Sequence, residues 1–358
     1  MMKFPAETRE FRRFMAVVNA TALVCLLSVC GKEAPRERVE YIFGTVCSIR
    51  LQQGGSDDVY RRIFARLREI DDIFSVNKTG TVFDEINREA GARPVKVPAE
   101  ALRVLDRALY FAELSGGKFD PTIGPLVKLW GIGLGGESVP PQDKIDEALS
   151  LINWRDVVID SENGTAFLKK KNMALDLGGV VKGYAADEAL AIVIDSGVKG
   201  ALIDLGGNII VYGEKRAKQS GKPWRIGIQD PFKERGEYIG VLEIEGGAVV
   251  TSGDYERFFE QDGLRYHHIL STETGYPVEN DVVAVTVTQR VPPRGGIGGA
   301  LDADALSTTL FALGAEDGFS LVRQMDGTGA VFALKDGKIL VTPNLQNSFA
   351  AAAHADGY

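Results

Sequence analysis

Residues 201–288 contain eight short stretches rich in β-branched and aromatic side chains, and this region decides the fold. They are ALID (201–204), NIIVYG (208–213), WRIGIQ (224–229), YIGVLEI (238–244), AVVTS (248–252), YERFFEQ (255–261), LRYHHIL (264–270) and VVAVTVT (282–288). Such residues favour β-strands, and Asp262-Gly263, a dipeptide typical of hairpin turns, separates two of the stretches. The region therefore predicts a succession of strands joined by short turns.

Helical patterns lie on both sides of this region. Apolar residues recur at helical spacing in Asp58–Phe74, and the helical pattern of Ala99–Ser115 stops at a Gly pair. The other expected elements are helices from Pro140 to about Ile152, over Gly183–Ser196, Asp302–Leu313 and Glu316–Met325, strands within Val39–Leu51, and hairpins over Asn163-Gly164 and Asp336-Gly337. Strands and helices mix without strict alternation, so we predict an α+β fold: one large domain over residues 39–343 with mixed or antiparallel sheets and packed helices.

The N-terminal residues predict export. Four basic residues (Lys3, Arg9, Arg12 and Arg13) precede the uncharged run Met15–Cys30, which is short for a membrane span and suits the core of a signal peptide. Leu27-Ser28-Val29-Cys30 has the shape of a lipobox. We therefore expect a signal peptide over 1–29, a lipid on Cys30, a linker over 30–38 and a position on the outer, periplasmic face of a bacterial inner membrane. An uncleaved anchor or a plain secreted protein are the alternatives, and we expect residues 344–358 to form a disordered tail.

Composition excludes several classes of protein. The chain has 358 residues, 45% of them hydrophobic, and a net charge of −8 with a pI near 5.2. Such an acidic chain lacks the basic surface that nucleic-acid binding requires. Its three His, one of them near the C-terminus, argue against a three-His zinc site, and its three Cys are too few for a disulfide scaffold.

Two glycine-containing segments carry candidate ligand contacts. In Lys118–Pro125 (KFDPTIGP), a backbone shaped by Pro and Gly presents Phe119 for stacking on a planar ring and Asp120 as a hydrogen-bond acceptor. In Asp176–Tyr184 (DLGGVVKGY), a strand is expected to run into a glycine turn and a helix start, where free N–H groups and Lys182 favour an anion. A rigid turn with a capping Asp, and a plain strand-to-helix turn, are the structural alternatives.

Two further segments carry oxygen and nitrogen ligands. Asp304 and Thr308 are one helical turn apart, so their oxygens face the same side and suit Mg²⁺, whereas Asp302 lies on another face. The alternative makes Asp302 a helix cap and Thr308 a surface hydroxyl. His267 and His268 point to opposite sides of a strand, so at most one of them reaches any given site.

Taken in order, these motifs resemble the ApbE-type flavin transferases, FAD:protein FMN transferases of the bacterial envelope. The resemblance covers roughly residues 40–343. It runs through Phe43-Gly44-Thr45, Phe74-Ser75, GGKFDPTIGPLVKLWGIG (116–133), ALDLGGVVKGYAADEAL (174–190), ALIDLGGNI (201–209), VVTSGDYERFF (249–259), YHHIL (266–270) with TGYPV (274–278), and DADALSTTLFALG (302–314). Ser271-Thr272 stands where the family usually has Asp-Pro, and Phe43 where it usually has Met.

The resemblance implies a substrate, a metal and a set of site residues. Mg²⁺ would be held by Asp304, Thr308 and the backbone carbonyl of Gly179. FAD would contact Phe43, Lys118, Phe119, Asp120, Asp176, Lys182, His268 and Ile269. FMN would pass to a Thr or Ser of another envelope flavoprotein and AMP would leave, with His268, Asp304 or Asp302 as the candidate base. An FAD pyrophosphatase using the same site and a non-catalytic FAD-binding lipoprotein are the alternatives.

Overall fold

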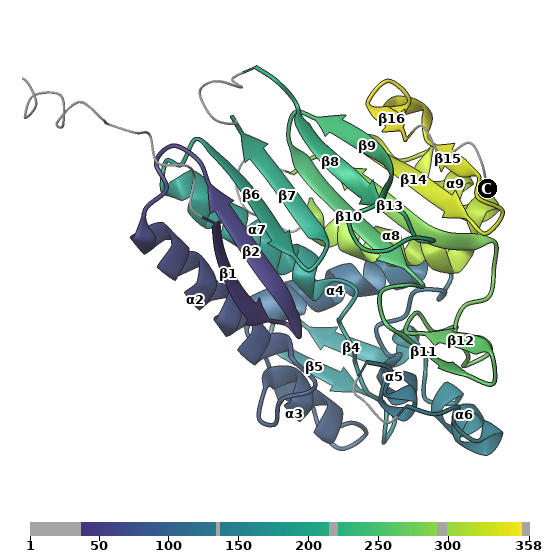
Figure 1. Ribbon diagram of the computed structural model, residues 1–358. Coiled ribbons are helices and arrows are strands. Elements are labelled where there is room, and N and C mark those ends of the chain that lie inside the picture. Colours follow the sequence, from purple (N-terminus) through teal and green to yellow (C-terminus); the bar gives the residue numbers. More distant parts are fainter. Residues whose placement is uncertain (1–36, 134–136, 215–220, 292–298, 353–358) are drawn as a thin grey trace, which may run out of the picture. The chain divides into compact units, whose positions relative to one another are not determined.

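The computed structural model describes residues 37–133, 137–214, 221–291 and 299–352. The predicted signal peptide, Cys30 and most of the predicted linker lie outside these residues. From Glu37 onward the chain forms one unit (Figure 1). None of the helices in the described ranges is long and apolar enough to span a membrane.

An eight-stranded sheet forms the centre of the fold (Figure 1). Its strands, in spatial order, are β1 (Glu37–Ile42), β2 (Thr45–Leu51), β6 (Gly200–Leu205), β7 (Asn208–Gly213), β10 (Gly247–Gly253), β13 (Val282–Gln289), β14 (Thr328–Leu334) and β15 (Ile339–Val341). Every neighbouring pair is antiparallel. Strands adjacent in the sheet also follow one another along the chain, and the other elements are inserted between them.

Helices cover one face of this sheet and a second sheet covers part of the other. The main core joins the sheet to α2 (Asp57–Phe74), α4 (Ala99–Leu114), α7 (Val181–Asp195), α8 (Ala300–Leu313) and α9 (Ala315–Val322). A separate apolar cluster joins the opposite face of β7, β10, β13 and β14 to β8 (Trp224–Gln229), β9 (Tyr238–Ile244) and β16 (Phe349–Ala351). Ile210 and Val211 illustrate the alternation along β7, because Ile210 belongs to the first cluster and Val211 to the second.

The remaining elements flank these layers. They are α3 (Val82–Arg88), α5 (Gly124–Trp130), α6 (Gln142–Leu149), the small sheet of β3 (Val95–Lys96), β5 (Thr165–Leu168) and β4 (Val157–Asp160), the hairpin of β11 (Phe258–Gln261) and β12 (Leu264–His267), and two short 3₁₀ turns, Trp154–Asp156 and Pro343–Leu345. A third cluster, with buried Leu126, Trp130, Ile145 and Leu270, joins α5 and α6 to the chain after β12.

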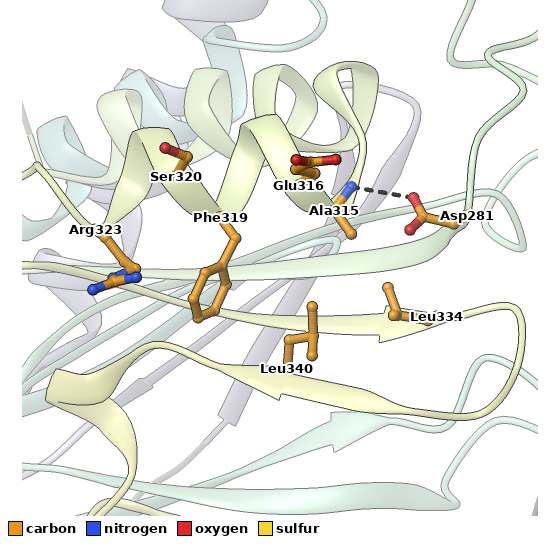
Figure 2. Close-up of a pocket in the computed structure, with 8 residues that line it drawn as sticks. All are labelled: Asp281, Ala315, Glu316, Phe319, Ser320, Arg323, Leu334 and Leu340. Carbon is orange, nitrogen blue, oxygen red and sulfur yellow. Dashed lines mark hydrogen bonds between the residues drawn. The ribbon is translucent and has the colours of Figure 1, made fainter.

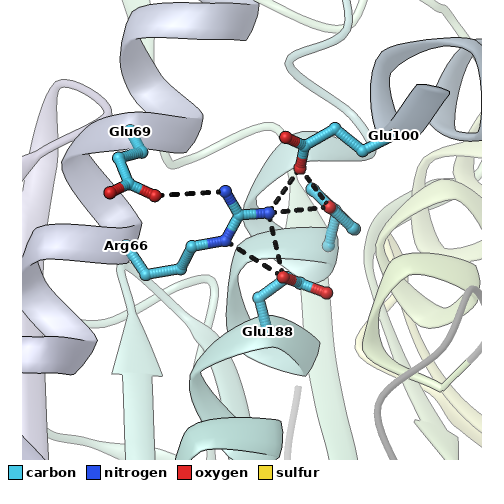
Figure 3. Close-up of polar contacts among 5 residues, drawn as sticks. Arg66, Glu69, Glu100 and Glu188 are labelled. Atoms are coloured by element: carbon cyan, nitrogen blue, oxygen red, sulfur yellow. Dashed lines mark hydrogen bonds and ion pairs between the residues drawn. The ribbon is translucent and has the colours of Figure 1, made fainter. Parts of the chain in front are cut away.

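A half-buried ion network joins α2, α4 and α7 (Figure 3). The guanidinium of Arg66 on α2 contacts Glu100 on α4 and lies 2.9 Å from a carboxylate oxygen of Glu188 on α7. The hydroxyl of Tyr184 donates to Glu100 at 2.6 Å. Because Tyr184 lies in the first turns of α7, the network fixes the start of that helix against two neighbours.

The α+β prediction is confirmed, but three local predictions were wrong. The expected tail begins with structure, because Phe349–Ala351 pairs with β9. Residues 174–180 form a turn with a single bridge to Ile123 rather than a strand. Gly124-Pro125, expected within a rigid loop, begins α5, where Pro is tolerated because a first-turn N–H needs no intrahelical partner.

Candidate active site

Helices α7 and α8 meet at their N-terminal turns with almost no space between their backbones. A Cβ on Gly183 would lie 2.1 Å from the carbonyl oxygen of Ala300, so only glycine fits. Asp304 of α8 accepts from the N–H of Gly183 at 2.9 Å, and Asp187 of α7 accepts from the N–H groups of Ala300 and Leu301 at 3.0 and 2.9 Å. We call these contacts the reciprocal caps, because each helix supplies the carboxylate that satisfies free N–H groups of the other.

The reciprocal caps leave one oxygen of Asp304 facing a cation. Its Oδ1 lies 3.6 Å from Nζ of Lys182, which also donates to the carbonyl of Gly178 at 3.0 Å. One turn further along α8, Oγ1 of Thr308 lies 3.2 Å from Oγ of Ser252. Asp304 is buried, so a charged carboxylate there needs cationic or hydrogen-bonding partners.

Gly179 joins this group to the aromatic ring of the first motif. A Cβ on Gly179 would lie 3.6 Å from Oγ1 of Thr308 and 3.1 Å from Cε2 of Phe119. The predicted metal ligands Gly179, Asp304 and Thr308 therefore lie in one cluster, with Phe119 beside it. A side chain at position 179 would press on the Phe119 ring, which would have to shift by a few tenths of an ångström.

The cluster fits Mg²⁺ by the chemistry of its donors. A carboxylate, a hydroxyl and a backbone carbonyl are all hard oxygen ligands, and Oδ1 of Asp304 already faces the ammonium of Lys182. Within the described ranges no three His, Cys, Asp or Glu side chains are grouped to hold a metal. Phosphate oxygens of a substrate and water would therefore have to complete the octahedral shell that Mg²⁺ requires.

Asp120 holds the loop that presents Phe119. Its Oδ1 accepts from the N–H and the hydroxyl of Thr122 at 2.8 and 2.7 Å, and its Oδ2 accepts from the N–H of Trp154 at 3.0 Å. Burial raises the pKa of Asp120, and these hydrogen bonds oppose the rise. The structure thus gives this carboxylate three internal hydrogen bonds from two residues, which position the loop.

A turn after β12 supports the same loop from the other side. Lys118 forms an ion pair with Glu273 at 2.7 Å, and the hydroxyl of Thr272 donates to the carbonyl of Gly117 at 2.8 Å. Oγ of Ser271 accepts from the N–H groups of Glu273 and Thr274. Ser271-Thr272, where the sequence departs from the usual Asp-Pro, therefore still makes a hydrogen-bonded turn.

The two adjacent His have different neighbours, although β12 ends at His267 and His268 lies beyond the strand, where alternation does not apply. His267 is buried with its ring edge against Phe311, and burial lowers its pKa to about 4. His268 lies beside Arg257, whose carbonyl oxygen is 3.3 Å from Nδ1. A carbonyl only accepts hydrogen bonds, so we assign the proton to Nδ1 and the free lone pair to Nε2. Burial and then the Arg257 charge lower the pKa of His268 to about 3, so this imidazole is neutral at physiological pH.

Arg257 connects predicted parts of the site that are far apart in the sequence. A Cβ on Gly133 would lie 3.4 Å from Cδ of Arg257, and one on Gly44 would lie 3.9 Å from its Nη2. Gly44 follows Phe43 in the β1–β2 turn, where Phe43 has a φ of 56°. Burial raises the pKa of Asp176. The hydrogen bond that its Oδ1 accepts from the N–H of Gly178 at 2.8 Å and the charge of Arg257 both oppose this rise.

Two predicted residues have mainly internal roles. Asp302, a candidate base, is buried and forms two hydrogen bonds of 2.7 Å with Arg107 of α4. Ile269 is buried after His268, and its N–H donates to Nδ1 of His267. Of the candidate bases, His268 therefore has a free lone pair, whereas both oxygens of Asp302 are bound.

Sequence reasoning did not assign functions to Asp187, Ser252 and Arg257. Ser252 and Arg257 lie in the motif VVTSGDYERFF, so their segment was found but their individual roles were not. Asp187 gave no signal of its own, because its partners, Ala300 and Leu301, lie 113 and 114 positions away.

A surface groove lies away from these residues (Figure 2). It measures about 420 Å³ and runs between α9 and strands β14 and β15. Phe319, Leu334 and Leu340 form its apolar part, and Glu316, Arg323 and Asp281 its polar part. No residue predicted for the site lines this groove.

Comparisons with known proteins agree on one family. The family model described as "ApbE family" matches residues 43–332, a range that includes every residue assigned to the site. An FAD:protein FMN transferase of Treponema pallidum is 36% identical over 337 residues, or 88% of this chain and 91% of that protein. One from Klebsiella pneumoniae is 38% identical over 281 residues, or 78% and 84% of the two chains.

Solved structures give the same result. A crystal structure of the ApbE protein from Thermotoga maritima has a TM-score of 0.77 at 32% identity and covers 88% of this chain and 99% of its own. The flavin transferase ApbE from Vibrio cholerae has a TM-score of 0.75 at 26% identity, covering 87% and 98%. The predicted resemblance and fold class are thus confirmed.

Proposed function

This chain belongs to the ApbE family, and on that premise we propose that it is a Mg²⁺-dependent FAD:protein FMN transferase. It splits the diphosphate of FAD, attaches FMN by a phosphoester bond to a Thr or Ser of an envelope flavoprotein, and releases AMP. The observation that carries the proposal is the convergence of Asp304, Thr308 and Gly179 with the Phe119 ring and Lys182.

The residues of this cluster suit the two ends of FAD. Phe119, held by the Asp120 loop, would stack a ring face on a flavin or adenine, and the partly buried Phe43 adds apolar surface. Lys182 and the start of α7 offer positive charge to the diphosphate. Mg²⁺, when bound at Asp304, Thr308 and the Gly179 carbonyl, would neutralise charge that develops on the phosphate oxygens.

His268 is the candidate base best suited to take the proton of the acceptor hydroxyl, because its Nε2 lone pair is free. As the hydroxyl oxygen bonds to the FMN phosphorus, the bond from that phosphorus to the bridging oxygen breaks and AMP leaves with the bridging oxygen. The released proton passes to Nε2 of His268, which is unprotonated because Nδ1 donates to Arg257. An anionic diphosphate nearby raises the basicity of this imidazole above its value in the free protein.

The test uses the purified protein with FAD, Mg²⁺ and a Thr-containing acceptor domain from an envelope flavoprotein. Intact-mass spectrometry detects FMN attached to the acceptor, and chromatography measures the AMP and free FMN that are released. A Mg²⁺-dependent gain of one FMN by the acceptor supports the transferase. AMP with free FMN and an unmodified acceptor supports the pyrophosphatase, and uncleaved bound FAD supports the binding protein.

A pair of variants isolates the metal ligand from the helix cap. Asp304→Asn keeps an oxygen for the Gly183 N–H but removes the charge, and we expect at least a 10²-fold loss of turnover with FAD still bound. Asp302→Asn is the matched control on the same helix, since its carboxylate faces Arg107. Normal turnover by Asp304→Asn would remove Asp304 from the metal assignment.

We also propose that Cys30 is lipidated and tethers the domain to the outer face of the inner membrane. The uncharged run ending in a lipobox-shaped Leu27–Cys30 supports this location. Mass spectrometry of the N-terminal peptide tests it: acyl chains on Cys30 agree with the proposal, and a free or uncleaved N-terminus contradicts it.

A further inference from the structure

The outer face of the β1–β2 hairpin exposes three large apolar side chains. Val39, Tyr41 and Val46 are 56%, 74% and 56% exposed, and Tyr41 pairs directly with Val46 across the two strands. The apolar cluster beneath the second sheet includes residues from β6 onward and none of β1 or β2. In Figure 1, β8 and β9 accordingly lie over the central strands, whereas β1 and β2 lie to one side.

The charged side chains around this face are already paired. Glu37 forms an ion pair with Arg50 at 2.8 Å, and Ser48 also bonds to Glu37. On the opposite side of β1, Arg38 pairs with Asp57 and Glu40 with Arg68. The hairpin therefore presents an apolar face without net charge.

The short segment between Cys30 and the hairpin indicates which surface this face can contact. Only six residues separate Cys30 from Glu37, the first residue of β1. A chain of that length spans at most about 25 Å when fully extended. A lipid on Cys30 would therefore keep Val39, the third residue of β1, within reach of the bilayer surface, where a weak surface contact is favoured by a high effective concentration.

We propose that the face formed by Val39, Tyr41 and Val46 rests on the bilayer surface beside the lipid anchor. This proposal rests on the proposed lipidation of Cys30. Tyr, with an apolar ring and a polar hydroxyl, is suited to the headgroup region, and the two Val add apolar contact. Residues 1–30 carry a net charge of +2, so the remaining chain carries −10. The rest of the acidic surface is repelled by anionic lipid, which leaves this neutral face as the favourable orientation.

The test labels single cysteines in the full-length, processed protein. Val39→Cys probes the proposed face, and Leu264→Cys, at a residue 61% exposed on β12, is the matched control. The native Cys47 is buried, and burial raises the pKa of its thiol to about 12, so a maleimide probe leaves it unmodified. The protein is reconstituted into vesicles of phosphatidylethanolamine and phosphatidylglycerol and labelled with an environment-sensitive fluorophore.

We expect at least two-fold stronger quenching by spin-labelled lipids at position 39 than at position 264. Equal quenching at both positions in acylated protein would contradict the proposed contact of this face with the bilayer, but not the lipidation of Cys30. Missing acyl chains on Cys30, read by mass spectrometry, overturn the anchor itself. A blue shift at position 39 that persists in detergent, together with a concentration-dependent increase in particle size, overturns the bilayer contact in favour of a second copy of the chain.

Discussion

The low pKa of His268 can be tested by the pH dependence of the reaction. An imidazole whose pKa is about 3 stays neutral down to about pH 4, so kcat/KM for FAD should remain level from pH 8 to about 5. An imidazole with the ordinary value would lose half of its free base near pH 6.5. The measurement is the pH profile of kcat/KM, and a decline centred near pH 6.5 would contradict the environment described for His268.

His268→Gln provides the matching variant. It removes the proposed proton acceptor without adding a charge, and we expect kcat to fall by roughly 10²–10⁴-fold while FAD binding changes little. Fluorescence titration of FAD separates the two effects. A variant that loses binding and turnover to the same extent would assign His268 to substrate contact alone.

His267 should make stability depend on pH. Its pKa is near 6.5 in the unfolded chain and about 4 in the folded one, so the unfolded state binds more protons between these values. Stability is therefore lost as pH falls from about 6.5 to 4, by about 3 kcal/mol for this group. Urea unfolding at several pH values measures the loss, and His267→Gln should make its slope shallower. An unchanged slope would mean that His267 does not contribute.

Individual site residues could be identified from the sequence where they lie within a recognisable motif. Phe119, Gly179, Asp304 and Thr308 were named in advance, and the structure groups them. The pairing of Asp302 with Arg107, which occupies both oxygens of a candidate base, could not be predicted, because the two lie 195 positions apart. A local sequence pattern indicates which interactions a side chain can make, whereas the fold determines which residue it contacts.

Asp187 is the residue on which the start of α8 depends. Asp187→Asn would leave one of the N–H groups of Ala300 and Leu301 facing an amide N–H₂ in a buried setting, which costs about 1–3 kcal/mol. Because Asp304 lies on the next turn, turnover should fall as well. Chemical unfolding and kcat are the measurements.

The control for Asp187→Asn is Asp195→Asn, at the exposed end of the same helix. That change should alter the free energy of unfolding by less than about 0.5 kcal/mol. A similar effect from both variants would show that the reciprocal caps add nothing specific.

At the scale of elements, periodicity succeeded where a helix has one buried face. Helix α2 alternates buried Ile63, Leu67 and Ile70 with exposed charges, and its predicted and observed limits differ by one residue. Strand β16 was missed because FAA is short and pairs with β9, more than a hundred residues earlier in the chain. Such pairing leaves no local pattern to read.

At the scale of the whole molecule, the C-terminal strand contributes to stability although the sequence there resembles a tail. The ring of Phe349 lies against β9, where a Cβ on Gly240 would be 2.3 Å from it. Removing residues 349–358 should lower the free energy of unfolding by about 2–4 kcal/mol, because the ring and three paired residues are lost. Removing only residues 353–358 leaves β16 in place and should change the melting temperature little. Equal melting temperatures for both truncations would contradict this role.

The reciprocal caps also determine how the protein opens. The amide hydrogens of Gly183, Ala300 and Leu301 are held by carboxylates from the opposite helix rather than by carbonyls of their own. Separating α7 from α8 frees all three at once, so hydrogen exchange at these amides reports a single opening event and not the fraying of two helices. Asp304, the proposed metal ligand, is part of that event. Local unfolding and the candidate active site thus depend on the same contact between α7 and α8. A ligand that stabilises this contact should also slow amide hydrogen exchange at the starts of both helices.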